Sequence, residues 1–181
     1  MGLYLGLTGY RMNAADSLYA GFADSFVPEK DFEQMKKALI DAGNPDPIAA
    51  FSCPPTEQGV LASWQADCDN LLAASDVRGA ADANFADADM DKFWKKALAH
   101  NAPLSMLCTA EILHRLSPQD DVTTALDLEY RFTYRSMDEG EFLEGTRAAV
   151  IDKDRTPDWQ YKRLDEVSDE KVNAMLAELP K

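Results

Sequence analysis

The stretch VTTALDLEYRFTYRSMDEGEFLEGTRAAVIDKDRTPDW, residues 122–159, decides the fold of this chain. Its first part carries apolar residues at helical spacing, in two arcs of the helix surface. One arc comprises Val122, Leu126, Tyr130, Tyr134 and Met137, and the other comprises Ala125, Leu128 and Phe132. Because a helix that is apolar on two sides needs neighbours on both, we expect this helix to be sandwiched between other elements.

A charged pair is expected within the same stretch. Glu129 lies between the two apolar arcs, where a carboxylate would be partly buried and would need a partner. Gly140 predicts the end of the first helix, and a second amphipathic run follows at residues 142–150 before Thr156-Pro157 ends it. A sharp turn at Gly140 would bring the two helices side by side, so we predict an ion pair between Glu129 and Arg147.

Composition limits the class of protein. The chain has 181 residues, of which 46% are hydrophobic, and this is enough to form a domain with a core. Its 32 acidic and 18 basic residues give a net charge of −14, which argues against nucleic acid and against an anionic membrane surface as partners. No apolar run is long enough to span a bilayer. We therefore predict an acidic cytoplasmic protein.

The three cysteines, Cys53, Cys68 and Cys108, are far apart and form no CxxC pair. A disulfide framework or a zinc site is not expected, and the default is reduced, buried thiols. His100 and His114 are also too far apart for ligand-like spacing. The aspartates between residues 82 and 91 lack the glycine and the terminal glutamate of a calcium loop, so they indicate a solvated acidic face. We predict no metal site.

The N-terminus is almost wholly apolar from Met1 to Leu7. A helix of this composition needs cover on most sides, and exposed it would favour aggregation. Either the segment packs into the core of this domain, or the chain begins inside a larger protein. We favour the second interpretation.

Residues 7–28, LTGYRMNAADSLYAGFADSFVP, contain closely spaced boundary signals. Gly9 fits the left-handed residue after a helix, and Asn13 with Asp16 predicts the cap of a short helix over 14–20 that ends at Gly21. The alternation in residues 22–27 predicts a short strand closed by Pro28.

The remainder is predicted to be helical, so the fold class is mainly α. Proline clusters mark loops at 43–47 and 53–56. Amphipathic or apolar periodicity predicts helices over 29–42, 61–74, 90–99 and 103–116, a helical turn near 77–81 within the low-complexity stretch 75–88, and a C-terminal helix capped by Ser168.

Two parts of the sequence resemble a known family. Residues 7–28 resemble the segment that follows the active-site region in the crotonase (enoyl-CoA hydratase/isomerase) superfamily. The motifs LEYR (128–131), FLEGTRA (142–148), IDKD (151–154), and then Pro157 and Trp159, resemble its 3-hydroxyisobutyryl-CoA hydrolase branch. The resemblance covers residues 1–27 and 101–179, and the helical stretch between them is longer than in plain hydratases, which favours the hydrolase branch.

The resemblance implies the helical C-terminal half of a crotonase-like α/β fold, with at most a short strand near 22–27. It divides the chain into the end of the crotonase-like core (1–44), an acidic helical insertion (45–100) and a C-terminal helical region (101–181). It also implies thioester hydrolysis in valine catabolism without a cofactor, since coenzyme A is part of the substrate. The implied partners are an acyl-CoA, the missing N-terminal half and further copies of the chain.

In that family the catalytic groups precede the segment that this chain matches, so we expect no catalytic residue here and an inactive fragment with Leu3, Leu5 and Leu7 uncovered. Glu129, Glu141 and Glu144 are the carboxylates in structured, partly apolar settings, and pairing or capping explains them more simply than catalysis. By the resemblance, Lys153 is a candidate contact for the CoA phosphates, although a surface pair with Asp152 or Asp154 is an alternative. Two other functions stay open: hydratase or isomerase chemistry, and a helical interaction module that is not an enzyme.

Overall fold

The computed structural model describes residues 1–73 and 76–180. Ala74 and Ser75, the last residue of one predicted helix and the first of the low-complexity stretch, lie outside the described residues. The described chain contains helices and no strand, which confirms the mainly α class. Residues 22–27, where a short strand was predicted, pair with no other strand there. The chain divides into two compact units, residues 11–66 with Met1 and residues 2–10 with 67–181.

The first unit contains three complete helices, α2 (Ala14–Tyr19), α3 (Phe32–Ala42) and α4 (Ile48–Phe51), and the boundary between the units falls within α5 (Leu61–Ala73). The predicted helix over 29–42 begins as a 3-10 turn at Glu29–Asp31 and ends at Gly43, whose φ of 66° is left-handed. Asn13 caps α2 by accepting from the Asp16 amide, as its sequence predicts.

Asp16 is the buried carboxylate of the first unit. Its Oδ1 accepts the N–H groups of Val60 and Leu61, at 2.8 and 2.9 Å, and so caps the start of α5 from a distant part of the chain. A Cβ on Gly59 would lie 2.6 Å from this oxygen, so a glycine is needed where the two segments meet. Asp16 therefore joins two helices in addition to its expected place in the cap of α2.

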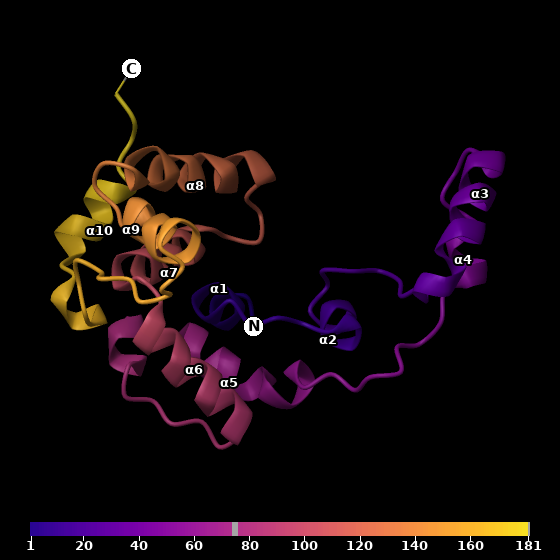
Figure 1. Cartoon of the computed structure of the whole chain (residues 1–181), viewed down its shortest axis with the longest axis horizontal. Coiled ribbons are helices and arrows are strands. Elements are labelled where there is room, and N and C mark those ends of the chain that lie inside the picture. The colour runs from indigo at the N-terminus through magenta and orange to yellow at the C-terminus, as the bar shows by residue number, and fades with distance from the viewer. Residues whose placement is uncertain (74–75, 181) are drawn as a thin grey trace. The chain divides into compact units, whose positions relative to one another are not determined.

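The second unit is built around α7 (Pro103–Arg115). Its other helices are α1 (Gly2–Thr8), α6 (Ala88–His100), α8 (Val122–Ser136), α9 (Phe142–Thr146) and α10 (Asp169–Met175), with 3-10 turns at Val77–Ala80 and Leu164–Glu166 and a π-helical segment at Arg147–Ile151. Helices α1, α8 and α10 each contact α7 (Figure 1). Helix α7 is apolar on most sides, and its central position is expected for a helix of that composition.

The N-terminal helix α1 is covered, and the prediction that Leu3, Leu5 and Leu7 would lie open was wrong. All three are buried, as is Tyr4, because α1 packs between α6 and α7. Gly6 permits the close approach, since a Cβ there would lie 3.1 Å from Cγ2 of Thr109. The apolar N-terminus is therefore part of the core of this unit.

Aromatic side chains fill the contact between α1 and α6. The ring of Tyr4 stacks on Trp94 with centroids 6.4 Å apart, and Phe85 meets both rings edge-on. The polar ends reach backbone carbonyls: the Tyr4 hydroxyl donates to Met90 O at 3.0 Å and Trp94 Nε1 to Ala80 O at 3.1 Å. Burial raises the pKa of the Tyr4 hydroxyl, which fixes it as a hydrogen-bond donor.

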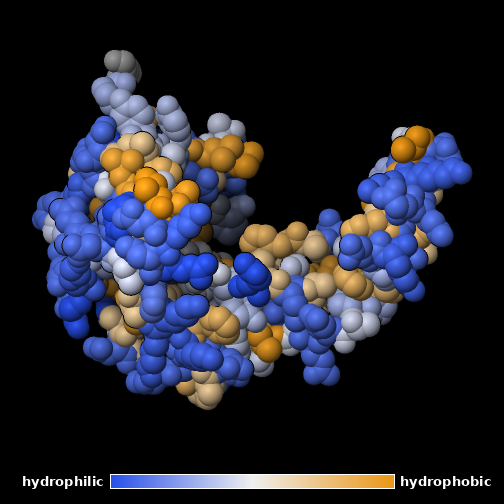
Figure 2. Space-filling view, in the orientation of Figure 1, coloured by the Kyte–Doolittle hydropathy of each residue, from blue (hydrophilic) through white to orange (hydrophobic). Residues whose placement is uncertain are grey.

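Helix α8 is not sandwiched, contrary to the prediction. Only the second arc is covered: Leu128 is buried and Ala125 and Phe132 are half-buried. The first arc, Val122, Leu126, Tyr130, Tyr134 and Met137, is 47–72% exposed. We use the name open apolar face for this arc together with the exposed Phe142 and Leu143 of α9 and Val150 and Ile151 of the π-helical segment. Figure 2 shows separate areas of hydrophobic surface in the region of α8 and α9.

The cysteines differ in burial. Cys68 and Cys108 are buried, and desolvation raises the pKa of their thiols to about 11 and about 12. Cys53 is exposed, so the prediction of buried thiols was wrong for this residue, which lies in the proline-rich loop after α4.

Candidate functional site

The family-like motif of residues 142–159 forms a network around one guanidinium. Arg147 pairs with Glu144 through Nη2 at 2.7 Å and with Asp152 and Asp154 through Nη1 at 2.6 and 2.7 Å. Its Nη2 also donates to the carbonyl of Thr156 at 3.2 Å. One arginine therefore fixes the π-helical segment to the turn that follows it.

The network lowers the pKa of two of its carboxyl groups, those of Glu144 and Asp154. The Arg147 guanidinium and the Asp158 amide hold the pKa of Glu144 at about 2, well below 4.5, and Arg147 also lowers the pKa of Asp154. These carboxylates are ionised acceptors with fixed partners, which is typical of a structural cluster and unlike a general acid or base. The structural interpretation of Glu144 agrees with this arrangement.

The small residues of the motif permit close packing. A Cβ on Gly145 would lie 3.2 Å from Cη2 of Trp159, and Ala148 is buried. Trp159 donates from Nε1 to the carbonyl of His100 at 2.9 Å, which ties the end of the motif to the end of α6. Gly145, Ala148 and Trp159 are thus explained by packing.

Glu129 and Arg147 do not form an ion pair, so that prediction was wrong. Glu129 is exposed, because the arc of α8 beside it is left open by the described residues, and Arg147 is engaged by Glu144 and the two aspartates. A partner for Glu129 was expected because its carboxylate was predicted to be buried. An exposed carboxylate is hydrated and needs no such partner.

Lys153, the predicted CoA contact, lies on the turn of this network. It is exposed, and its φ of 58° is left-handed, as is the φ of 56° at Arg155. Two such residues in one turn are costly, and the surrounding contacts hold them in place. Its alternative surface partners, Asp152 and Asp154, are bound by Arg147. Within the described residues Lys153 forms no ion pair with either aspartate, and both aspartates share the single guanidinium of Arg147 with Glu144.

Glu141 is the buried carboxylate of this region, and only 7% of its surface is exposed. Its Oε1 accepts the backbone N–H groups of Gln160 and Tyr161, so it caps the segment after Trp159. Desolvation raises its pKa above 4.5. In the sequence, Glu141 has a setting similar to those of Glu129 and Glu144, and only the contact with residues 160–161, distant along the chain, separates it from them.

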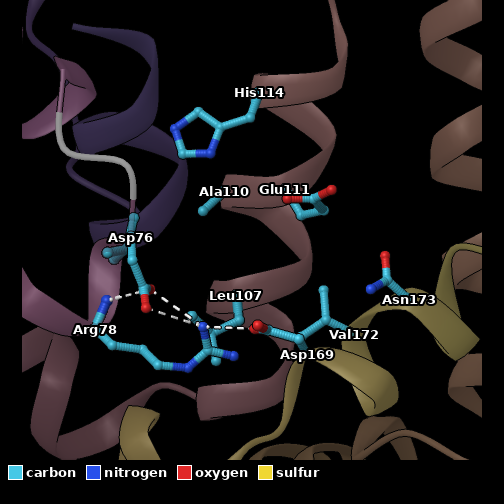
Figure 3. A pocket seen from close by; sticks show the side chains of 10 residues that line it. Asp76, Arg78, Leu107, Ala110, Glu111, His114, Asp169, Val172 and Asn173 are labelled. Carbon is cyan, nitrogen blue, oxygen red and sulfur yellow. Dashed lines mark hydrogen bonds and ion pairs between the residues drawn. The ribbon is translucent and has the colours of Figure 1, made fainter.

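A polar cavity of about 270 Å³ lies beside α7 and α10. In Figure 3 the side chains of Asp76, Arg78 and Asp169 converge at one end of it, and His114 lies at the other. Arg78 Nη1 pairs with Asp76 at 3.2 Å and Asp169 at 3.0 Å, while Nε and Nη2 donate to Val167 O. This cluster fastens the 3-10 turn at residues 77–80 to the start of α10.

The aspartates that could bind a metal ion make other contacts. Asp87 caps α6 by accepting from the amides of Asp89 and Met90, and Asp91 pairs with Lys95 at 2.7 Å. No group of three or more histidine, cysteine or acidic side chains in the described ranges, 1–73 and 76–180, is placed to hold a metal ion. Within those ranges there is also no helix long and apolar enough to cross a membrane.

Comparison with known proteins places this arrangement in context. The family model described as "Enoyl-CoA hydratase/isomerase" matches residues 1–176. The chain is 40% identical to the solved structure of an enoyl-CoA hydratase from Rhodobacter sphaeroides, with a TM-score of 0.83 over 98% of this chain and 51% of that one. A carnitinyl-CoA dehydratase from Mycobacterium thermoresistibile is 26% identical with a TM-score of 0.82, over 98% and 51% of the two chains.

Curated relatives include the mitochondrial 3-hydroxyisobutyryl-CoA hydrolase of Mus musculus, 27% identical over 99% of this chain and 49% of the mouse protein. The 3-hydroxyisobutyryl-CoA hydrolase-like protein 5 of Arabidopsis thaliana is 27% identical over 97% of this chain and 49% of the plant protein. The chain thus spans about half the length of the relatives it matches.

Proposed function

The chain belongs to the enoyl-CoA hydratase/isomerase family, and from this premise we propose that it is the helical C-terminal part of an acyl-CoA enzyme, a 3-hydroxyisobutyryl-CoA hydrolase. Its activity would be thioester hydrolysis in valine catabolism. The observation that carries the proposal is the match of nearly the whole chain to about half of each relative.

The open apolar face supports a binding partner for this chain. Five side chains on one arc of α8 are 47–72% exposed, and α9 with the π-helical segment adds four more. Large apolar side chains exposed in one region are typical of an interaction site. We take its partner to be the N-terminal half of the enzyme, because this chain matches the other half of the relatives. Association with further copies of the chain is the competing occupant.

Hydratase chemistry is the second candidate. The solved relative at 40% identity is named an enoyl-CoA hydratase, whereas the relatives named as hydrolases are 22–28% identical. Both reactions act on a CoA thioester, and both need donors aimed at an oxyanion. The groups that would separate the two reactions lie outside this chain under either proposal.

The decisive experiment joins the two halves. The reading frame upstream of the Met1 codon is cloned, and the encoded N-terminal half is expressed separately. Purified halves, alone and mixed, are assayed for thiol release from 3-hydroxyisobutyryl-CoA and for hydration of an enoyl-CoA. We expect turnover only in the mixture, since losing even one oxyanion donor costs on the order of 10²–10³ in rate. Thiol release by this chain alone, abolished by mutating one of its carboxylates, would overturn the proposal.

Variants of the open apolar face test the assembly. Leu126→Ser together with Tyr134→Ser should raise the concentration of N-terminal half needed for half-maximal activity, because both side chains are exposed and apolar in the free chain. Thr123→Ser, on the exposed side of the same helix, is the matched control. If the wild-type chain, the double variant and Thr123→Ser all need the same concentration of N-terminal half for half-maximal activity, the interface lies elsewhere.

Lys153 remains our proposed contact for the CoA phosphates. In the reconstituted enzyme, Lys153→Ala should raise the KM for the CoA ester and leave kcat unchanged, because a distant cation binds substrate and transition state equally. Lys162→Ala, a second exposed lysine in the same region that pairs with Asp158, serves as control. An unchanged KM for Lys153→Ala would remove this role.

Location and segment boundaries also stay predictions. The names of the vertebrate relatives include the word mitochondrial, which is said of those proteins, and our sequence-based expectation is cytoplasmic. Cell fractionation with an antibody against this chain decides between the two.

The division at residues 44 and 100 can be tested by limited proteolysis, which should cut first in the proline-rich loops at 43–47 and 53–56.

A further inference from the structure

The turn after the π-helical segment, residues 152–156, is built around the guanidinium of Arg147. Its Nη1 contacts the carboxylates of Asp152 and Asp154 at 2.6 and 2.7 Å, and its Nη2 donates to the carbonyl of Thr156 at 3.2 Å. These contacts come from every second residue of the turn. One side chain therefore binds the turn at its start, its middle and its end.

Lys153 and Arg155 occupy the positions between these contacts. Their φ angles of 58° and 56° are left-handed, and both side chains are exposed. Every other left-handed residue in ranges 1–73 and 76–180 is a glycine: Gly9, Gly21 and Gly43. A Cβ disfavours this conformation, and glycine adopts it freely. The turn thus carries two long cationic side chains at positions where their backbone is strained.

Backbone hydrogen bonds also act on this turn. The Asp152 amide donates to the carbonyl of Arg147 at 2.8 Å, and the Arg155 amide donates to the carbonyl of Ala148 at 3.0 Å. The charged contacts differ from these bonds because they lie on both sides of each strained residue. Strain of this kind persists only where the surrounding contacts hold it.

We propose that Arg147 is a positioning residue: its guanidinium holds residues 152–156 in the left-handed form that fixes the place of Lys153 for its contact with the CoA phosphates. The contact with substrate rests on the function proposed above, whereas the hold on the turn is a property of this chain alone.

A fixed turn affects substrate binding more than chemistry. A cation on a relaxed turn must be ordered when the phosphate binds, and that ordering weakens affinity. A turn that is already held avoids this loss. Because the phosphates lie far from the thioester, the gain is the same in the bound substrate and in the transition state, so it appears in KM and not in kcat.

The hold on the turn is tested in the isolated chain. Lys153→Gly and Lys153→Ala are compared by urea denaturation, with Arg147 present and in the Arg147→Met background. With Arg147 present, the folding equilibrium constant of the glycine variant should be about fivefold larger, since glycine has no strain at positive φ. In Arg147→Met this preference should disappear or reverse, because a relaxed turn no longer favours glycine. Arg155→Gly and Arg155→Ala should behave in the same way.

The control is Arg163→Met. Arg163 is an exposed arginine that pairs with Asp165 at 2.9 Å and makes no contact with the turn in the described part of the chain. The preference for glycine at position 153 should remain about fivefold in this background. If Arg147→Met fails to fold, Asp152→Asn combined with Asp154→Asn removes two of the same contacts from the side of the turn and takes its place.

The consequence for substrate is tested in the mixture of the two halves. Arg147→Met should raise the KM for the CoA ester about as much as Lys153→Ala does, with kcat unchanged. The combined variant should raise KM no further than either single change, because both act through the same contact. Arg163→Met should leave KM unchanged.

Several results would overturn the proposal. If wild-type Arg147 gives no preference for glycine at position 153, the turn is not strained, and if the preference persists in Arg147→Met, the backbone bonds hold the turn. An unchanged KM in Arg147→Met, or additive effects in the combined variant, would remove the positioning role while turnover by the mixture still supports the proposed function. A mixture without turnover would count against that function, and the isolated chain would still decide whether Arg147 holds the turn.

Discussion

The two sides of the second unit are held together by different forces. Around α1, α6 and α7 the contacts are apolar and aromatic, and side chains such as Leu3, Tyr4 and Trp94 are buried. Around α8, α9 and the π-helical segment, the contacts are charged hydrogen bonds from Arg135 and Arg147, and the apolar side chains face outward. The first side is a closed apolar core, whereas the second leaves large apolar side chains exposed, which we propose the N-terminal half covers.

The difference matters because the two kinds of contact respond differently to mutation. Apolar burial is lost with the side chain and leaves a cavity. A charged hydrogen bond on the surface is partly replaced by water, so its loss changes local order more than global stability. The following predictions test this contrast, from the largest expected effect to the smallest.

Trp94→Ala should have the largest effect. Its ring is 0% exposed and contacts both Tyr4 and Phe85, so we expect a loss of about 3–5 kcal/mol in the free energy of unfolding. Urea denaturation followed by circular dichroism measures it. Trp94→Phe retains most of the packing and loses the bond to Ala80 O, and its loss should be clearly smaller. Similar losses for both variants would contradict the packing argument.

Arg135→Gln should be intermediate. Its Nη1 donates to the carbonyls of Met175 and Ala177 at 3.2 and 2.8 Å, and its Nη2 to that of Glu178 at 3.1 Å, which joins α8 to the end of α10. The guanidinium satisfies carbonyls that α10 leaves open, and we expect a loss of about 1–2 kcal/mol. Hydrogen exchange should rise in residues 172–178. Arg131→Gln, whose corresponding contact with Leu176 O is long at 3.5 Å, is the matched control and should lose less.

Glu141 and Glu144 should titrate on opposite sides of 4.5. The pKa of Glu144 is lowered to about 2, so its contribution to stability is present above 4.5 and is lost as the pH falls toward 2. Burial raises the pKa of Glu141, so its contribution is present below 4.5 and is lost as the pH rises through the folded-state value. Carboxyl NMR titration measures both.

Arg147→Met separates the two groups. It removes the largest cause of the low pKa of Glu144, which should rise toward 4.5 while the Asp158 amide keeps it somewhat below. The titration of Glu141 should not change, because its contacts are with residues 160–161. An unchanged pKa of Glu144 would show that the backbone, not the arginine, holds it.

The smallest effect is expected on the open apolar face. Leu126→Ala and Tyr134→Ala remove side chains that are 56% and 55% exposed, so stability should change by less than about 0.5 kcal/mol. Losses near those of Trp94→Ala, measured in the same urea experiment, would mean that this face is covered in the isolated chain.

Much of the local structure was predictable. Asn13 and Ser168 cap helices with their own side chains, and Gly9 takes the left-handed conformation after a helix, all as predicted, whereas the cap of α6 by Asp87 was not predicted. These features depend on a few neighbouring residues and on backbone stereochemistry. The family was likewise predictable, because the motifs around Gly9 and Gly145 have fixed spacings.

The candidate site was predicted less well. Lys153 lies on the turn after the π-helical segment, and its contact with a CoA phosphate stays a prediction. The buried contact of Glu141 with the backbone of residues 160–161 was not predicted, since it requires that segment to return to the start of α9. Nothing in the spacing of the glutamates distinguishes Glu141 from Glu129.

By itself, the sequence determined the helical class, most helix ends and the family, because caps, periodicity and motifs act over a few residues. The tertiary structure decided which apolar face is covered and which partner each charge takes. Leu3 is buried and Leu126 is exposed although both lie on apolar arcs, since burial depends on what packs against the arc. Arg147 binds Glu144 and the aspartates of its own turn, because these lie within reach and Glu129 stays in solvent.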